Sequence, residues 1–485
     1  MAQSKSKITN RNPKLPKMEV IKKMMADENL IPIEDFFTAY FLCRKHKRST
    51  PNSRHFEINY EEKLLELWYE VNKREYEIGT SICFLVRRPK LREVFAADFR
   101  DRIIHHIIMM RLEPLFEEMF IDDTYNCRKE KGTLYGINRL HEKVKEASEN
   151  YTKKCYIGKF DLQGFFMSIH KPTLWKLLRE FINNNYYGKD KEIILYLVKK
   201  VILHHPERNC KMKTPAHEWK KLPKNKSLFT CGMDRGLAIG NLTSQCFANF
   251  YMHFFDDFMA SQFKYYGRYV DDFFVIADTK EEIASVVPKM KHFLSQMLKL
   301  RLHPDKTYIQ SYDKGVKFTG SVVKGERKYL GNQTVSGMYD KIRLFNYNIS
   351  EANAETFMQT LNSYFGFMKH YSTYGIAYKM ALKIDPEWFK YIVIKNMTKA
   401  EIKGHIKETK RIGKELQTKE GIEKYFGVVN DEDSMIYLDP EEADRLKVMP
   451  DMCRIFGTVK EKVKLTIKKE TVSFTENEKK KEFLL

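Results

Sequence analysis

The sequence predicts an α+β protein in which strands end at a small set of aspartates. Two short runs rich in β-branched and aromatic residues, 264–268 and 273–277, are typical of strands and flank Tyr269-Val270-Asp271-Asp272. A third run of this kind, 155–160, ends at Asp161. Apolar residues at helical spacing predict further helices at 60–77, 101–118, 173–185, 191–204, 243–260 and 280–300.

The three aspartates predict a metal site. Two adjacent carboxylates at a hairpin tip repel each other unless a cation, most simply a divalent metal ion, lies between or in front of them. An Asp-Asp pair is also a common surface turn, so Asp271-Asp272 alone is a weak signal. Asp161 in a similar setting strengthens it, because three such carboxylates are able to hold two Mg²⁺ ions about 4 Å apart.

Three stretches of the chain resemble motifs A, B and C of reverse transcriptases, and they occur in the family's order. These stretches are 160–166, 236–245 and 269–272. The residue sequence of 239–245, Ile-Gly-Asn-Leu-Thr-Ser-Gln, is most similar to motif B of bacterial enzymes from diversity-generating retroelements and their defence-associated relatives. The segment 92–102 is also most similar to segments of these enzymes. The resemblance implies a right-hand polymerase with fingers, a palm that has an antiparallel sheet, a helical thumb and an extra C-terminal region.

The resemblance also implies a division of the chain. We expect a basic N-terminal extension that lies on RNA or forms a solvated tail, followed by fingers, palm and thumb, and then a region without a recognised motif. The expected segments are 1–59 for the extension, 60–150 for the fingers, 151–325 for the palm with an inserted basic segment near 205–230, 326–385 for the thumb, and 386–485 for the C-terminal extension of unknown role.

Composition limits the partners and the compartment. The chain has 85 Lys and Arg against 64 Asp and Glu, a formal net charge of +21 that favours a polyanion such as nucleic acid. Eight cysteines without CxxC pairs predict a reduced, cytoplasmic protein. No apolar run reaches the roughly 18 residues that span a membrane, so we expect no membrane partner.

Basic residues of the expected fingers are candidates for binding the incoming nucleotide. Arg92 matches the family's motif position, and Lys90 is its companion at the end of a predicted hairpin, where basic side chains hold the triphosphate. Arg128 lies in a polar loop that resembles the second fingers motif. It contacts the template or the triphosphate, or it belongs to a solvated charge run.

The palm supplies further candidates through the resemblance. Phe166 falls where the family packs a side chain against the nucleotide sugar, which implies selection of deoxynucleotides, whereas Phe165 on strand alternation belongs to the core. Ile239 stands where retroviral-type enzymes have glutamine, a pattern that accompanies relaxed template discrimination. Gln245 completes the motif-B candidates. Lys306, in a segment that resembles motif D, is expected near the leaving pyrophosphate.

Two more segments are expected to contact nucleic acid. The stretch 315–320 resembles the primer-grip hairpin of motif E, with Phe318 and Gly320 as its candidate residues. Between motifs A and B, the segment 210–227 carries many lysines and is either a loop that contacts the duplex or a soluble insertion. Its lysines are Lys211, Lys213, Lys220, Lys221, Lys224 and Lys226.

The expected chemistry is transfer of a deoxynucleotidyl group to a primer 3′-hydroxyl on an RNA template. Asp161, Asp271 and Asp272 are the catalytic candidates, and with Leu162 they form the expected ligand set for two Mg²⁺ ions. Asp161 and Asp271 should hold the metals directly. Asp272 should be more peripheral, because consecutive strand residues point apart.

Several functions remain open from the sequence. The favoured one is an RNA-directed DNA polymerase in bacterial antiphage defence, with a dedicated non-coding RNA as template, dNTPs as substrates, DNA as product, and a partner protein or homo-oligomer left open. The alternatives are a mutagenic reverse transcriptase of a diversity-generating retroelement, an untemplated or protein-primed DNA polymerase, and a non-enzymatic RNA-binding scaffold.

Overall fold

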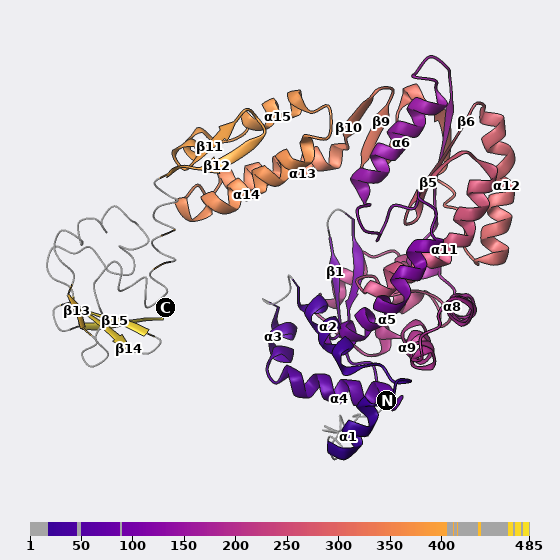
Figure 1. Cartoon of the computed structure of the whole chain (residues 1–485). Helices are drawn as coiled ribbons and strands as arrows, with labels where there is room; N and C mark the ends of the chain where they lie inside the picture. Colours follow the sequence, from indigo (N-terminus) through magenta and orange to yellow (C-terminus); the bar gives the residue numbers. More distant parts are fainter. Residues whose placement is uncertain are drawn as a thin grey trace. The chain divides into compact units, whose positions relative to one another are not determined.

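The chain forms two compact units, Met1–Tyr329 and Leu330–Leu485 (Figure 1). This computed structural model describes residues 18–45, 50–87 and 90–404, Arg411 and Glu415, and the backbone of four strands between 435 and 484. Within these residues, none of the helices has both the length and the hydrophobicity of a membrane span.

The first unit contains most of the helices and the two sheets that matter for function. Its helices are α1 (Met18–Met25), α2 (Ile33–Arg44), α3 (Pro51–Glu57), α4 (Tyr60–Asn72), α5 (Phe99–Met119), α6 (Thr133–Ala147), α7 (Phe165–Ser168), α8 (Lys171–Asn185), α9 (Lys191–Leu203), α10 (Ala216–Trp219), α11 (Leu242–Gln262) and α12 (Lys280–Met297), with 3₁₀ turns η1 (Pro206–Arg208), η2 (Lys224–Lys226), η3 (Leu228–Thr230) and η4 (Tyr312–Lys314).

A four-stranded antiparallel sheet lies at the centre of this unit, in the order β5-β6-β3-β7. Its strands are β3 (Tyr156–Asp161), β5 (Tyr265–Tyr269), β6 (Asp272–Ala277) and β7 (Tyr308–Ser311). The register pairs Asp161 directly with Asp272, so motif A and motif C meet at one end of the sheet. The expected antiparallel palm sheet is therefore present.

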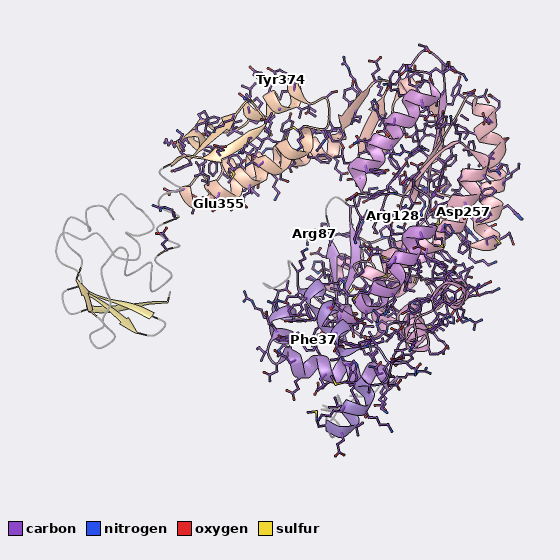
Figure 2. The ribbon with its side chains drawn as sticks, in the orientation of Figure 1. Phe37, Arg87, Arg128, Asp257, Glu355 and Tyr374 are labelled. Atoms are coloured by element: carbon purple, nitrogen blue, oxygen red, sulfur yellow. The ribbon has the colours of Figure 1, made fainter. Side chains whose placement is uncertain are left out.

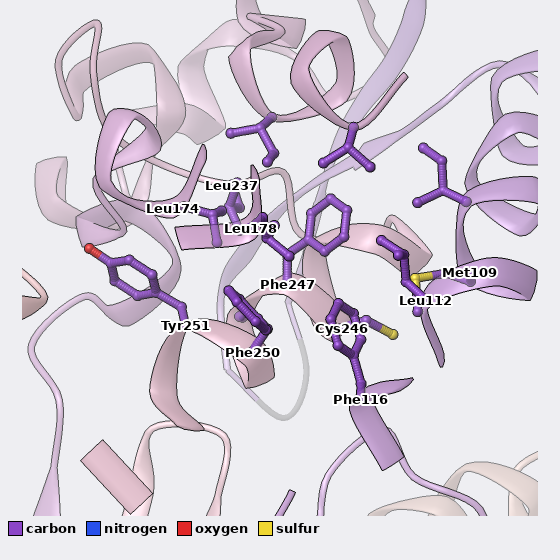
Figure 3. Packing of buried hydrophobic residues seen from close by; sticks show 14 of the residues in the cluster. Met109, Leu112, Phe116, Leu174, Leu178, Leu237, Cys246, Phe247, Phe250 and Tyr251 are labelled. Atoms are coloured by element: carbon purple, nitrogen blue, oxygen red, sulfur yellow. The ribbon is translucent and has the colours of Figure 1, made fainter. Parts of the chain in front are cut away.

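Helix α11 forms the middle of the core because it is buried on nearly all sides. The ring of its Phe250 lies 5.3 Å from that of Phe116 in α5, and both are labelled in Figure 3. It also lies 5.3 Å from the ring of Phe181 in α8. Phe255, one turn further on, packs 5.3 Å from Phe273 of β6. The aromatic side chains of α11 thus tie the helical layer to the strand that begins at Asp272.

A second sheet differs from the expected fingers hairpin because it has a third strand. The hairpin of β1 (Ser81–Val86) and β2 (Arg92–Ala96) is extended by β4 (Cys210–Met212), which pairs in parallel with β1. The basic segment near 205–230, expected as part of the palm, therefore packs on the fingers. A third sheet contains β8 (Val316–Phe318), β9 (Ser321–Lys324) and β10 (Arg327–Leu330), and the last residue of β10 is the first of the second unit.

The N-terminal extension also differs from the expectation. From Ile33 on, it packs into the core: Phe36 and Tyr40 of α2 are fully buried, and the Tyr40 ring stacks 4.8 Å from that of Tyr60. This aromatic packing explains why α2 is part of the body of the unit. Residues 1–17 and 46–49 lie outside the described residues.

The second unit has its own core. Its elements are α13 (Asn332–Asn346), α14 (Glu351–Met368), α15 (Tyr374–Ala381), η5 (Pro386–Lys390), β11 (Ile392–Lys395), β12 (Lys399–Ile402), β13 (Met435–Tyr437), β14 (Lys464–Lys468), β15 (Thr471–Glu476) and β16 (Lys479–Leu484). Trp388 is fully buried, with its ring 4.5 Å from that of Phe357. The helical unit therefore continues past the expected boundary at 385.

Candidate active site

The hairpin that carries Asp271 has an unusual backbone. Tyr269 pairs with Asp272, so Val270 and Asp271 form the two-residue turn between β5 and β6. Val270 has φ of 60°, which is rare for a β-branched residue and strains the backbone. The Val270 N–H donates to Asn126 Oδ1 at 2.8 Å, and the Val270 carbonyl accepts from Arg268 Nη1 at 2.9 Å.

Two lysines balance the carboxylates that face each other across the sheet. Asp161 and Asp272 are directly opposite, an arrangement that costs stability when both are charged. Lys306 Nζ donates to Asp161 Oδ1 at 2.8 Å, and the Lys159 ammonium contacts the Asp272 carboxylate. Burial lowers the pKa of Lys159 to about 8, against the carboxylates of Asp161 and Asp271, which raise it. Each opposed carboxylate thus has its own cation.

Asp271 lacks such a partner within hydrogen-bonding distance among the described residues. Burial raises the pKa of its carboxyl group, and the nearby charge of Asp161 raises it further. The Asp271 carbonyl accepts from the Leu162 N–H at 3.1 Å, so the turn and the end of motif A are joined through the main chain. A raised carboxyl pKa beside a second carboxylate indicates a place where an additional cation is stabilised.

The oxygen atoms at this position fit a hard divalent ion. Asp161 and Asp271 supply carboxylates, and Leu162 places main-chain atoms beside them, which is the ligand chemistry of Mg²⁺. The described residues contain no group of three or more His, Cys, Asp or Glu side chains that could hold a metal. Asp272, expected as a third ligand, is instead paired with Lys159.

Comparison with known proteins identifies the family. The family "Reverse transcriptase (RNA-dependent DNA polymerase)" matches residues 87–331, half of the chain. The chain belongs to the reverse transcriptase family. Members of this family generally use divalent metal ions. Protein YkfC of Escherichia coli (strain K12) is 22% identical over 280 residues, which are 51% of this chain and 66% of YkfC.

Two solved telomerase structures are also similar to this reverse transcriptase chain. Apo telomerase from Candida tropicalis, truncated from its C-terminal domain, has 13% identity and a TM-score of 0.37 over 52% of this chain and 55% of that chain. Telomerase from Candida albicans in complex with the TWJ fragment of telomeric RNA has 12% identity and a TM-score of 0.39. This match covers 79% of the present chain and 63% of the telomerase chain. The chain spans about two thirds of YkfC and less of each telomerase chain.

The reverse transcriptase motif B is held against the fingers sheet by its backbone. The Ile239 carbonyl accepts from the Phe95 N–H at 2.9 Å, so this residue joins the edge of β2. Gly240 has φ of +114°, and a Cβ there would lie 2.8 Å from Val94 Cγ1. Only glycine fits both the conformation and the space. Gln245 is exposed on α11, where its Oε1 accepts from Cys127 Sγ at 3.1 Å.

The other nucleotide-binding candidates have different surroundings. Arg92 and Lys90 are exposed at the tip of the fingers hairpin and available to a ligand. Phe165 is buried, 3% exposed, whereas Phe166 is half-buried, as the predicted roles of core and sugar contact require. The two are consecutive residues of a short helix, α7, so their side chains point about 100° apart and do not alternate as on a strand.

The Arg128 side chain, unlike those of Arg92 and Lys90, is buried and already bonded within the protein, so it is not available to a ligand. Arg128 is labelled in Figure 2. Its guanidinium donates to both carboxylate oxygens of Glu117, at 3.1 and 2.9 Å, and to the Ile121 carbonyl at 2.6 Å. It also lies over the Phe120 ring, and its side chain is only 6% exposed. Arg128 therefore joins the end of α5 to the following loop, which corrects its expected role as a nucleotide ligand.

Of the two primer-grip candidates, one is buried and the other is exposed. Phe318 is fully buried, with its ring 5.2 Å from Phe274 of β6, and Lys159 Nζ lies 5.7 Å from its centre. Gly320 is exposed at the β8–β9 turn and has φ of +89°. Because Phe274 stands two residues after Asp272 in β6, Phe318 packs on the face of the sheet that carries this aspartate. Gly320 belongs to the accessible turn.

The basic insertion is an ordered part of the fingers. Ser227 Oγ donates to Glu93 Oε2 at 2.5 Å, and the Leu228 N–H donates to Glu93 Oε1 at 2.8 Å. Glu93 is fully buried, and burial raises its pKa. The six lysines of this segment are all exposed, and none forms an ion pair in the part of the chain that the structure describes.

Sequence reasoning missed two groups at this site. Lys159 stands two residues before Asp161, so strand alternation was a signal that it shares the face of the aspartate. The polar residues Asn126, Asn249 and Arg268 gave no comparable signal, because their role depends on contacts between segments far apart in the chain.

Proposed function

We propose that the chain is an RNA-directed DNA polymerase that makes cDNA on an RNA template by two-metal nucleotidyl transfer. The observation that carries the proposal is the meeting of Asp161, at the end of β3, with the hairpin turn that carries Asp271, in a chain of the reverse transcriptase family. The raised pKa of the Asp271 carboxyl supports a cation between these two groups.

Within this proposal the metals are held by Asp161, Asp271 and the carbonyl of Leu162. Two Mg²⁺ ions bound there would activate the primer 3′-hydroxyl and neutralise charge on the leaving pyrophosphate. Lys306 Nζ donates to Asp161 Oδ1 at 2.8 Å, and its ammonium group would stabilise negative charge on the pyrophosphate if a metal ion took its place beside that carboxylate. Lys159 keeps Asp272 neutralised and outside the ligand set.

The remaining candidates define the substrate in this proposal. Arg92 and Lys90 hold the triphosphate from the fingers hairpin, and Phe166 lies against the sugar and excludes a 2′-hydroxyl. Ile239 and Gln245 border the base pair, and Gly320 contacts the primer. The exposure of Arg92, Lys90, Gln245 and Gly320 supports these roles.

The direct test compares wild type with an Asp271→Ala, Asp272→Ala variant, each purified after expression from the native locus. Sequencing of copurified nucleic acid should find DNA complementary to one bound RNA in wild type only. Repetitive DNA that matches no RNA would favour untemplated or protein-primed synthesis. RNA without DNA in both samples would favour an RNA-binding scaffold.

The lysine-bearing insertion is the proposed contact with the RNA template. Six exposed ammonium groups without carboxylate partners, fixed to the fingers by Glu93, match the charge of a phosphodiester backbone. Substitution of four of them, Lys211, Lys213, Lys220 and Lys221, by Gln should weaken RNA binding and reduce the slope of log K against log salt by about 3. The three lysines of α12, Lys280, Lys289 and Lys291, substituted together with Lys299 just after the helix, provide a control of equal number.

For the biological role we propose antiphage defence. The region beyond the thumb supports it, because the strands β13 to β16 form an additional sheet that the polymerase motifs do not require. Wild type should protect cells in a plaque assay, and the Asp271/Asp272 variant should not. Sequence changes in a neighbouring repeat, without protection, would instead favour a diversity-generating retroelement.

A further inference from the structure

Resting on the proposed polymerase function, we propose that Asn126 and Asn249 are positioning residues for Asp271. They form the end of a buried polar network that holds Val270 in its strained conformation and thereby fixes the metal-binding turn. The network also includes Arg268 and Asp256.

The two asparagines bond to each other reciprocally. Asn126 Nδ2 donates to Asn249 Oδ1 at 2.7 Å, and Asn249 Nδ2 donates to the Asn126 carbonyl at 2.6 Å. Asn126 is 3% exposed and Asn249 is 1% exposed. These bonds fix the amide of Asn126, so its Oδ1 remains free to accept the Val270 N–H at 2.8 Å. Asn249 lies on α11, so the core helix determines where the turn is held.

Arg268 holds the carbonyl group of Val270, whose N–H is held by Asn126. The Arg268 side chain is fully buried. It forms a bidentate ion pair with Asp256, in which Nε donates to Oδ1 and Nη2 donates to Oδ2, each at 2.6 Å. The Tyr266 and Thr124 hydroxyls donate to the same carboxylate at 2.6 and 3.2 Å. The guanidinium is thereby fixed, and Nη1 is left to donate to the Val270 carbonyl at 2.9 Å.

These bonds act on the backbone directly before Asp271. The Val270 N–H belongs to the peptide group that precedes Val270, and its carbonyl belongs to the peptide group that joins it to Asp271. Because peptide groups are planar, fixing both determines the two backbone angles of Val270 and the position of the Asp271 nitrogen. The Leu162 N–H then fixes the Asp271 carbonyl. The turn is held at three successive points.

The strain at Val270 explains why such a network is needed. A valine with φ of 60° has a lower-energy conformation available, and relaxation into it would rotate the next peptide group and move the Asp271 carboxylate. The network therefore acts through Val270 and touches neither metal nor substrate. Its loss should lower turnover and metal affinity more than it changes the apparent affinity for dNTPs.

The test uses the full chain with Asn126→Ala and a matched control, Asn72→Ala. Asn72 is also a buried asparagine, 8% exposed, that accepts from the Ile31 N–H at 2.9 Å and donates to the Ile31 carbonyl at 3.1 Å, away from the site. Per folded molecule, Asn126→Ala should lower kcat at least tenfold with KM for dNTPs within about twofold, and Asn72→Ala should retain wild-type kcat. Asn126→Ser replaces the alanine variant if that variant does not fold.

A second substitution separates positioning from general destabilisation. Val270→Gly removes the cost of positive φ, so the Asn126→Ala, Val270→Gly variant should recover most of the lost kcat. Equal kcat for Asn126→Ala and Asn72→Ala, or no recovery in the double variant, would overturn the proposal.

Binding of Mn²⁺, measured by titration without nucleotides, keeps this inference distinct from the polymerase proposal. Asn126→Ala should weaken the Mn²⁺ affinity about tenfold, and Asn72→Ala should leave it unchanged. If wild type binds Mn²⁺ in this manner but makes no DNA, the polymerase proposal fails and the positioning role stands. Unchanged Mn²⁺ affinity in Asn126→Ala refutes the positioning role, whatever the polymerase activity.

Discussion

Lys159 and Lys306 place an ammonium group beside each of two carboxylates that face each other across the sheet. Their exposures differ: the Lys159 side chain is 7% exposed and that of Lys306 is 47% exposed. Lys306 is thus able to exchange Asp161 for another anion, whereas Lys159 is a fixed counter-ion of Asp272. The difference supports the proposal that Asp161 and Asp271, and not Asp272, hold the metal ions.

Lys159→Met should therefore destabilise the protein in the absence of metal ions. The substitution keeps the apolar length of the side chain but leaves Asp272 without its counter-ion, opposite Asp161. Loss of one partner of a partly buried ion pair should lower the free energy of unfolding by about 2 kcal/mol. Urea unfolding in EDTA measures this change. The Lys159→Met, Asp272→Asn variant should regain most of it, and a double variant as unstable as the single one would contradict the explanation.

Phe166→Val should relax the choice of sugar. If the half-buried ring lies against the nucleotide sugar, its removal opens space for a 2′-hydroxyl, and the ratio of kcat/KM for dNTP over rNTP should fall by about 10²-fold. Single-nucleotide incorporation assays measure the ratio. Phe165→Leu, a change in the neighbouring core position, should lower stability without altering the ratio.

At the residue scale, the sequence identifies groups whose chemistry is unusual but not groups whose partners are distant. Asp161 and Asp271 are evident because paired carboxylates at strand ends need a cation. The position of Arg128 in a basic loop suggests a ligand contact, yet Glu117 of the preceding helix neutralises it. A charge read from sequence alone carries no information on whether a buried partner already compensates it.

At the scale of elements, α5 and α11 are joined by a buried histidine. His105 Nδ1 lies 2.8 Å from Thr243 Oγ1 at the start of α11, and burial lowers the pKa of His105 to about 3. Asp101, one turn earlier, has its pKa raised to about 6 by burial and accepts from the Tyr76 hydroxyl at 2.6 Å. As the pH falls, the lowered pKa of His105 reduces the stability of the folded state, whereas the raised pKa of Asp101 increases it.

His105 should make the first unit sensitive to acid. Its folded pKa lies below the unfolded value of about 6.5, so the unfolded chain binds the proton first and stability is lost as the pH falls from about 6.5 toward 3. Between pH 6.5 and 5.5 this one group should account for a loss of about 1 kcal/mol. His105→Gln should remove that loss, and urea unfolding at both pH values measures it. Equal pH dependence in both proteins would contradict this prediction.

The basic insertion near 205–230 shows which kind of element could not be assigned to a sheet from the sequence. The longer helices α4, α5, α8, α9, α11 and α12 were predictable because their apolar residues recur at helical spacing. The palm strands β3, β5 and β6 were predictable because they are rich in β-branched and aromatic residues. Strand β4 has only three residues, and it pairs with β1, which lies far earlier in the chain. Its location depends on the buried contacts of Glu93 with Ser227 and Leu228, which no local pattern reveals.

At the scale of the whole molecule, the division into segments was predictable where a motif marks it and not elsewhere. The motifs predict a thumb that starts at 326, and the second compact unit of the structure starts at Leu330. The N-terminal segment has no motif and many charges, which favoured an extension. Its buried residues, such as Phe36 and Tyr40, stand at helical spacing. The exposed apolar residues Phe41 and Leu42 beside them obscure this pattern, so the sequence does not show that α2 completes the core.

The two compact units should unfold separately. The first has a core around α11, and the second has its own core around Trp388, Phe357 and Leu361, so each has the apolar burial that a cooperative transition needs. Differential scanning calorimetry of the full chain should show two transitions. A fragment of residues 1–329 should reproduce one of them within about 1.5 °C, which corresponds to roughly 1 kcal/mol for a unit of this size. A single transition, or a fragment that loses its near-UV circular dichroism, would mean that the units depend on each other for stability. In that case the boundary at Tyr329 would mark a difference in architecture and not an independent folding unit.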